Sequence, residues 1–273
     1  EIIRPVNKNQ TEEFIIGNIG GVVGYMDGDN VYVTGSANRG TVHTSEPNDP
    51  ENVQDYEKAA NVGGIVGKID RSDTLELSDL NGEKGKITNA AVSNSYNTGD
   101  VLGYTGVGGV VGMMYNGEIA SSYNLGYLRS TRQSHVGPAT GTTEVVDALN
   151  MGGIVGDTTE DSNAKALLYD VYNKGQIGDK EFNYFGRHVG GVVGRLSGTV
   201  EKAYNTGAIY NGYNVVGGIA GWVATGKIQN AFNTGNITVY NQNESTSQVG
   251  GIAGAANGGG NVLINNVYNL GTL

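Results

Sequence analysis

The chain has 273 residues, of which 46 are glycine, 4 are proline and none is cysteine, and its formal net charge is −10. Glycine without a period of three excludes a collagen-like chain, the lack of cysteine excludes a disulfide scaffold, and the acidic balance argues against a nucleic-acid-binding protein. Hydrophobic residues make up 38% of the chain and charged residues only 16%, so it can bury a core and is not expected to be disordered.

The N-terminal segment differs from the rest of the chain. It opens Glu1-Ile2-Ile3-Arg4, without Met and without the charged and apolar regions of a signal peptide. We therefore expect the chain to be a piece of a longer protein, with residues 1–16 forming a cap or a partial repeat. No apolar run approaches 18 residues, so no membrane span is predicted in this piece.

From residue 17 to residue 273, two short motifs alternate seven times. The first is Gly-Gly-x-x-Gly, which begins at Gly20, Gly63, Gly108, Gly152, Gly190, Gly217 and Gly250. The second is Asn-x-Gly, which begins at Asn38, Asn97, Asn124, Asn173, Asn205, Asn233 and Asn269. Successive first motifs begin 43, 45, 44, 38, 27 and 33 residues apart. The bare unit is therefore close to 27 residues, and longer repeats carry insertions.

Counting from these motifs aligns the residues of the repeats in columns. The residue directly before the asparagine is aromatic in all repeats but the first: Ala37, Tyr96, Tyr123, Tyr172, Tyr204, Phe232 and Tyr268. Apolar residues stand five before it, at Val33, Val92, Ile119, Leu168, Val200, Ile228 and Ile264, and four after it, at Val42, Val101, Leu128, Ile177, Ile209, Ile237 and Leu273. They also precede the double glycine, at Ile19, Val62, Val107, Met151, Val189, Val216 and Val249, and follow it, at Val22, Ile65, Val110, Ile154, Val192, Ile219 and Ile252.

Short segments rich in Val and Ile and separated by Gly and Asn are typical of strands and turns. Residues 162–172 are the one stretch that could also be read as helical. Each repeat is too small to bury its own apolar face, but stacked copies would bury a continuous core. The sequence therefore predicts an all-β fold: a parallel β-solenoid of about seven coils over residues 17–273, with stacked asparagines and aromatic rings. The double glycine either lets backbone pass close to another group or bends a strand.

The repeat resembles the GLUG motif of bacterial surface proteins. The resemblance is carried by Val62-Gly63-Gly64-Ile65-Val66-Gly67 and Val189-Gly190-Gly191-Val192-Val193-Gly194, and by lines such as Ala203-Tyr204-Asn205-Thr206-Gly207. GLUG repeats occur in adhesin-like proteins and in the non-catalytic parts of immunoglobulin A peptidases. The resemblance implies an extracellular or cell-surface location, an adhesion or stalk role, and no active site within the repeats.

Insertions are expected to form loops at the edges of the solenoid. The longest lie at residues 43–60, 129–150, 178–188 and 239–248, before the double glycines, and at residues 70–86 and 157–165, after them. The first group carries tyrosines that could stack on sugar rings or simply cover the loop bases: Tyr56, Tyr184, Tyr240, Tyr210 and Tyr213.

No catalytic, cofactor or metal site is predicted. The three histidines, His43, His135 and His188, all lie in insertions and are expected to be solvated. The His-Glu-x-x-His zinc motif and the Gly-x-Ser-x-Gly elbow are absent. Asp27 and Asp29 resemble part of a calcium loop, but the position that would need a bidentate Glu is Asn38. Solvated turn acids are the simpler interpretation, and calcium binding is left open.

Two functions remain. The first is a non-catalytic adhesin-like or spacer module that binds a host glycan or extracellular protein through its insertion loops and adjoins neighbouring domains of a longer chain. The second is a carbohydrate-active β-helix enzyme, which would need Asp or Glu at matched positions on adjacent coils. No such match stands in the columns, which favours binding. Leu273 closes the seventh repeat without a cap, so we expect an exposed strand edge there and a native chain that continues beyond it.

Overall fold

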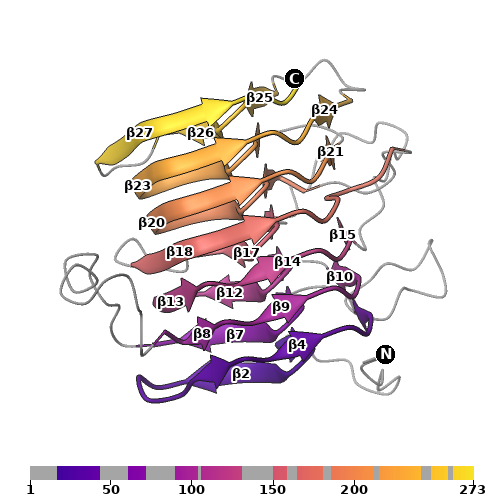
Figure 1. The fold of residues 1–273 in the computed structure, drawn as a ribbon, viewed down its shortest axis with the longest axis vertical. Helices are drawn as coiled ribbons and strands as arrows, with labels where there is room; N and C mark the ends of the chain where they lie inside the picture. Colours follow the sequence, from indigo (N-terminus) through magenta and orange to yellow (C-terminus); the bar gives the residue numbers. More distant parts are fainter. Residues whose placement is uncertain are drawn as a thin grey trace, which may run out of the picture.

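The computed structural model describes residues 17–43, 61–71, 90–103, 106–130, 150–158, 165–180, 186–211, 215–240, 247–257 and 261–273. These residues form strands and turns without helix, and every strand pairing among them is parallel. The coils stack along the long axis from the N-terminal to the C-terminal end (Figure 1). The predicted all-β parallel solenoid is confirmed. Residues 162–172 provide no helix in the part that the structure describes, since β18 (Ala166–Asn173) is a strand.

One side of the solenoid is a sheet with one strand from each of the seven coils. Its strands end on the first glycine of the double glycine, and they are β1 (Ile19–Gly20), β6 (Asn61–Gly63), β11 (Gly106–Gly108), β16 (Asn150–Gly152), β19 (His188–Gly190), β22 (Val215–Gly217) and β25 (Gln248–Gly250). The column from Ile19 to Val249 is in register throughout, as in the pairings Ile19↔Val62 and Val216↔Val249.

A large sheet of 15 strands forms two further arms of each coil. The arm after the double glycine contains β2 (Val23–Asp27), β7 (Val66–Asp70), β12 (Val111–Met114), β17 (Val155–Asp157) and β26 (Ala253–Ala256). The arm before the asparagine contains β3 (Val33–Thr34), β4 (Ala37–Asn38), β8 (Val92–Ser93), β9 (Tyr96–Asn97), β13 (Gly117–Ala120), β14 (Tyr123–Asn124), β18 and β27 (Val262–Asn269). In two coils a single long strand covers both arms, β20 (Val193–Asn205) and β23 (Ala220–Asn233).

The last side follows the Asn-x-Gly turn. It consists of β5 (Val42–His43), β10 (Val101–Gly103) and β15 (Leu128–Ser130), continued through isolated bridges at Ile177 to β21 (Ile209–Asn211) and β24 (Ile237–Val239). Each coil therefore returns to the seven-stranded sheet from this side, and the connection between the two is where most of the insertions enter the sequence.

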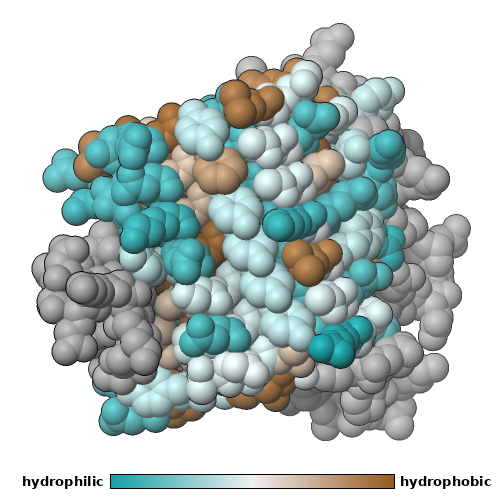
Figure 2. All heavy atoms as spheres, viewed as in Figure 1, coloured by the Kyte–Doolittle hydropathy of each residue, from teal (hydrophilic) through white to brown (hydrophobic). Residues whose placement is uncertain are grey.

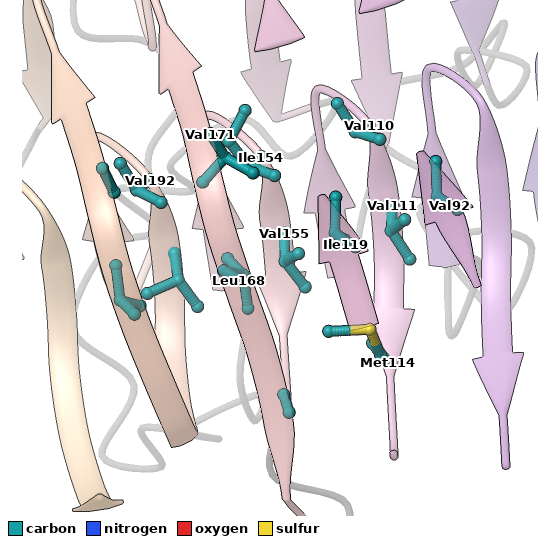
Figure 3. Close-up of a cluster of buried hydrophobic side chains, with 14 of the residues drawn as sticks. Val92, Val110, Val111, Met114, Ile119, Ile154, Val155, Leu168, Val171 and Val192 are labelled. Carbon is teal, nitrogen blue, oxygen red and sulfur yellow. The ribbon is translucent and has the colours of Figure 1, made fainter. Parts of the chain in front are cut away.

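The apolar columns fill the interior in two parallel cores. One lies between the two arms of the large sheet, where Val111, Ile119, Val155 and Leu168 are fully buried (Figure 3). The other packs the column before the double glycine against the column after the turn, and its members are Ile19, Val42, Val62, Val101, Val107, Leu128, Met151, Ile177, Val189, Ile209, Val216 and Ile237. Stacking thus buries what a single repeat could not.

The double glycine makes room for the asparagine ladder. A Cβ on Gly109 would lie 2.4 Å from Cγ of Asn124 and 2.2 Å from the carbonyl oxygen of Gly153 in the next coil. The second glycine of every motif stands against the asparagine of its own coil in the same way. The structure shows both roles that the sequence left open: the backbone closely approaches the asparagine side chain, and the chain bends between two strands at the second glycine and the residue after it.

The asparagine ladder is continuous and fully hydrogen-bonded in the interior coils. Asn124 Nδ2 donates to Asn173 Oδ1 at 2.8 Å and to the carbonyl oxygen of Gly126 at 2.9 Å, and the Gly126 N–H donates to Asn124 Oδ1 at 3.1 Å. The same links join all seven asparagines from Asn38 to Asn269. The buried amides are therefore satisfied along the whole stack.

The end coils stack on one side only, and their apolar residues are correspondingly exposed. Val22, Tyr25, Val31 and Tyr32 are 41–48% exposed in the first coil. In the seventh coil, Leu273 is 61% exposed, and it lies after the end of β27 rather than in a strand. Residues 1–16, which the sequence predicts as a cap or partial repeat, lie outside the described residues.

Candidate functional site

Insertions of very different length leave the solenoid along one edge. They join the strands after the Asn-x-Gly turn to the strands before the double glycine, and they range from residues 104–105 in one coil to residues 131–149 in another. Because both sets of strands are parallel and in register, the points where these connections leave and re-enter form two rows. The sequence predicted that insertions leave along one edge, and the two rows of strand ends show where that edge lies on the solenoid.

Two of the five tyrosines predicted near this edge can be located. Tyr240 is 53% exposed, and its backbone N–H donates to the carbonyl oxygen of Asn211 in the preceding coil. Tyr210 is half-buried in the preceding coil, in register with Thr238, and the Lys180 ammonium lies 5.7 Å from its ring centroid. Tyr56, Tyr184 and Tyr213 lie outside the described residues. The two tyrosines therefore lie on or directly after strands of adjacent coils at this edge, and the patch itself stays a prediction.

A third tyrosine near this edge was not singled out from the sequence. Tyr127 lies just before β15, with its hydroxyl 3.5 Å from Asp179 Oδ2. Burial, followed by the negative charge of Asp179, raises the pKa of Tyr127 to about 12. Its phenol therefore stays protonated and serves as a hydrogen-bond donor rather than as an acid.

The prediction that the histidines are solvated is wrong for His188, which is only 7% exposed. It begins β19, and its Nδ1 lies 2.7 Å from Asn150 Oδ1 in the preceding coil. Burial and the nearby charges of Arg187 and Arg195 lower the pKa of His188 to about 4, so the ring is neutral at pH 7. His188 is buried because it is already part of the seven-stranded sheet, rather than of an insertion. His43 is partly buried at the end of β5, and His135 lies outside the described residues.

His188 belongs to a cluster at the corner where the chain bends at the double glycine. We call the corner cluster Asn150, Asp157, His188, Arg195 and Trp222. Asn150 Nδ2 donates to Asp157 Oδ2 at 2.6 Å, across the bend. The rings of His188 and Trp222 are 5.1 Å apart and tilted by 34°, and Arg195 Cζ lies 4.5 Å from the Trp222 ring centroid. The corner cluster thus brings an aromatic ring, charges and amides together at one place.

The spacing of these residues from the double glycine was a usable signal for this cluster, and the motif columns did not include it. Asn150 and His188 both stand two residues before a double glycine, while Asp157, Arg195 and Trp222 pair in register on successive coils. The bend brings these two outward-facing columns together. These two columns would have been found by aligning the polar and aromatic residues around the double glycine as well as the apolar ones.

A buried ion pair links three coils at the opposite end of the first arm. Arg71 Nη1 donates to Glu118 Oε2 at 3.0 Å, and Arg71 Nη2 donates to the carbonyl oxygen of Val31 at 2.7 Å. Arg71 is 6% and Glu118 is 1% exposed. We interpret this pair as structural, because it joins three coils and because breaking it would leave a buried charge without a partner.

Matched acids do occur on adjacent coils, contrary to the sequence prediction. Asp27 pairs in register with Asp70, because each stands seven residues after the first glycine of its motif. Lys68 Nζ lies 3.6 Å from Asp70 Oδ2, and the Tyr25 hydroxyl donates to the same oxygen at 3.4 Å. The columns examined from the sequence were apolar and did not include this outward position.

The pair of acids does not by itself make a metal site. Over the residues that the structure describes, no group of three or more His, Asp or Glu side chains is arranged to hold a metal ion. Asp29 adds no third ligand to Asp27 and Asp70 in such a group. The described part of the chain also contains no helix long and apolar enough to cross a bilayer.

Comparison with known proteins adds no relative. No protein-family model, no curated protein and no solved structure matches the chain. The case for a function therefore rests on the residues themselves.

Proposed function

We propose that the chain is a non-catalytic, extracellular adhesin-like or spacer module of a bacterial surface protein. In this proposal the stacked coils form a rigid scaffold, and the edge that carries the insertions binds a glycan or protein of a host. The resemblance to GLUG repeats supports the location and the bacterial origin.

The observation that carries the proposal is that the repeated residues stabilise the stack, whereas chemically varied residues lie at the edge with the insertions. The repeated residues are committed to stacking: Asn173 and Leu168 are fully buried and hydrogen-bonded or packed within the coil stack. Chemically varied side chains such as Tyr210, Tyr240 and those of the corner cluster gather where the insertions leave and re-enter. A rigid scaffold that presents variable loops at one edge is a common arrangement for binding.

The outer face of the arm before the asparagine supports the same view. Its aromatic column is stacked ring on ring, with centroids 4.7 Å apart and planes within 4° between Tyr123 and Tyr172. Because the rings from Tyr123 to Phe232 are covered on both faces by their neighbours, a sugar has only ring edges to contact along this part of the column. The surrounding surface is largely polar in the view of Figure 2. Glycan stacking is therefore expected at the insertion edge and the corner, not on this column.

The test is binding of the whole chain to an array of host glycans and to purified extracellular-matrix proteins. We expect saturable binding to a restricted set of these. A variant in which residues 131–149 are replaced by a short Gly-Ser linker should bind differently while keeping the β-rich circular dichroism spectrum. Failure of the intact chain to bind any glycan or matrix protein would leave only the spacer role.

One observation favours the second candidate, a carbohydrate-active enzyme. Asp27 and Asp70 are matched acids on adjacent coils with Lys68 beside them, which is the arrangement that a lyase or hydrolase would need. The test is incubation with acidic and neutral polysaccharides, followed by detection of new reducing ends or unsaturated products. Product formation that disappears in Asp70→Asn would support the enzyme, and no product from any polysaccharide would count against it.

A further inference from the structure

The indole of Trp222 is covered on one face and lies beside a much smaller residue on the other. Trp222 stands in register between Arg195 of β20 and Ala255 of β26. The Arg195 guanidinium lies over the ring at 4.5 Å. On the other side the in-register residue is Ala255, which offers only a methyl group. Among the described residues, the ladder therefore places only a methyl group in register with the C-terminal face of the half-buried indole.

Small apolar residues lie next to that face of the indole and extend it into a shelf. Val215 stands one coil beyond His188 in the same column, and it is half-buried. Gly254, next to Ala255, lies so close to the backbone that a Cβ there would be 2.7 Å from the nitrogen of Val216. The two outward columns are therefore in contact at this level too. We define the indole shelf as Trp222, Ala255 and Val215.

Polar groups border the indole shelf. The indole Nε1–H donates to Asn257 Oδ1 at the edge of the ring, so the Trp222 orientation is fixed. Gln248, in register with Val215, is exposed. His188 packs against the ring from the preceding coil and is held by Asn150. An oriented aromatic face with amide groups at its rim offers stacking and hydrogen bonding at once.

We infer that the indole shelf is a binding subsite for one pyranose ring of a saccharide. The apolar C–H face of the sugar would lie on the open face of Trp222 and over Ala255. Its equatorial hydroxyls would exchange hydrogen bonds with the amides of Asn257 and Gln248. A protein partner fits less well, because the shelf is a single ring in a polar border and not a contiguous apolar patch. The inference rests on the proposed function and names the place and chemistry of the contact.

Trp222 also provides the measurement, because it is the only tryptophan in the chain. The whole chain is titrated with cellohexaose, chitohexaose and a hyaluronan hexasaccharide up to millimolar concentrations, and the indole emission is recorded. We expect a saturable change in emission with at least one of the three. The hyaluronan arm distinguishes an acidic saccharide from a neutral one.

The variant Ala255→Leu places a side chain over the open face without removing the indole. We expect it to weaken saccharide binding by about tenfold or more. The matched control is Ala37→Leu, the same change at an exposed strand position in the first coil, which should leave binding unchanged. Thermal unfolding of both variants shows whether the stack is intact, and Trp222→Phe supplies a second variant that keeps a ring but loses the indole N–H.

The outcomes separate the subsite from the wider function. Glycan-array binding that is equal in the wild type and in Ala255→Leu would overturn the subsite and leave the adhesin-like function standing. The absence of any emission change with all three saccharides would also overturn it. Array binding lost in Ala255→Leu but kept in Ala37→Leu would support both. No array binding by the wild type would remove the glycan-binding function together with the subsite that rests on it.

Discussion

The asparagine ladder and the aromatic ladder are adjacent in the sequence and opposite in environment. Asn173 is fully buried, whereas its neighbour Tyr172 is partly exposed on the outer face. The polar side chain is therefore inside and the ring outside, the reverse of the usual preference. This is stable because every buried amide is hydrogen-bonded along the stack, while each ring covers the faces of its neighbours.

The comparison shows how a repeat changes the cost of burial. A single buried asparagine would leave donors and acceptors without partners. In a stack, the same residue one coil away supplies the missing partner at 2.7–2.8 Å. The inner ladder should therefore depend on every member, while the outer one should tolerate change better. The following predictions test that difference, beginning with the largest effect.

The largest effect is expected where the glycine makes room for the inner ladder. Gly109→Ala would put a Cβ 2.4 Å from Asn124 Cγ and 2.2 Å from the carbonyl oxygen of Gly153. Neither can move without disturbing the next coil, so we expect a loss of about 3 kcal/mol or more in the free energy of unfolding. The thermal midpoint measures it. Gly17→Ala is the control, because nothing lies within 4 Å of a Cβ there.

The second effect is the removal of one amide from the middle of the inner ladder. Asn124→Ala would remove one of the two hydrogen bonds of Asn97 Nδ2 and one of the two of Asn173 Oδ1. It would also remove the Asn124 partner of both backbone groups of Gly126. We expect a loss of about 2–3 kcal/mol, read from the urea midpoint. Asn269→Ala, at the partly exposed end of the ladder, should cost clearly less. Equal losses at the two positions would show that the ladder is not cooperative.

These two predictions also mark what could be read from the sequence. The columns of Asn, Tyr, Val and Ile align in register as counted, because parallel stacking repeats each position at the same place. The sequence alone could not decide between the two roles of the double glycine, because close approach of the backbone and a bend in a strand both favour glycine. The structure shows that both occur at the same place: the second glycine approaches the asparagine of its own coil, and the chain bends there.

One repeated feature was missed although the sequence carries part of its signal. The residue three before each asparagine has a positive φ, and the column is Gly35, Asn94, Ser121, Asp170, Lys202, Asn230 and Asn266. Gly and Asn tolerate this conformation and fill four of the seven places. Ser121, Asp170 and Lys202 show that the stack imposes it on other residues too. The corner cluster was missed for a different reason: its members are outward residues, and only the bend brings their columns together.

The third prediction concerns the outer ladder. Tyr172→Ala removes a ring that stacks at 4.7 Å on both Tyr123 and Tyr204. We expect a loss of about 1–2 kcal/mol, from two stacked contacts at a partly exposed position. Tyr172→Phe keeps the stack and should change the free energy of unfolding by less than about 0.5 kcal/mol. A loss in Tyr172→Ala as large as in Asn124→Ala would contradict the distinction between the two ladders.

The smallest effect concerns His188, a titratable ring that contacts an asparagine of the preceding coil. Asn150 Nδ2 is used by Asp157, so Asn150 Oδ1 accepts from His188 Nδ1, which fixes the tautomer of the neutral ring. The folded pKa of His188, about 4, is below the ordinary value of 6.5. Between these values the unfolded chain binds more protons, so stability is complete above about pH 6.5 and falls as the pH drops towards 4.

We expect this histidine to account for a loss of about 1 kcal/mol between pH 7 and pH 5, allowing for partial solvent screening. The measurement is the urea midpoint at the two pH values in the wild type and in His188→Gln. The glutamine keeps an amide donor for Asn150 but does not titrate in this range, so the difference in pH dependence between the two proteins isolates the ring. A wild type and variant with the same pH dependence would show that acid reaches His188 without unfolding the corner. In that case the contact at the bend would be looser than the inner ladder, whose amides carry no charge at any pH.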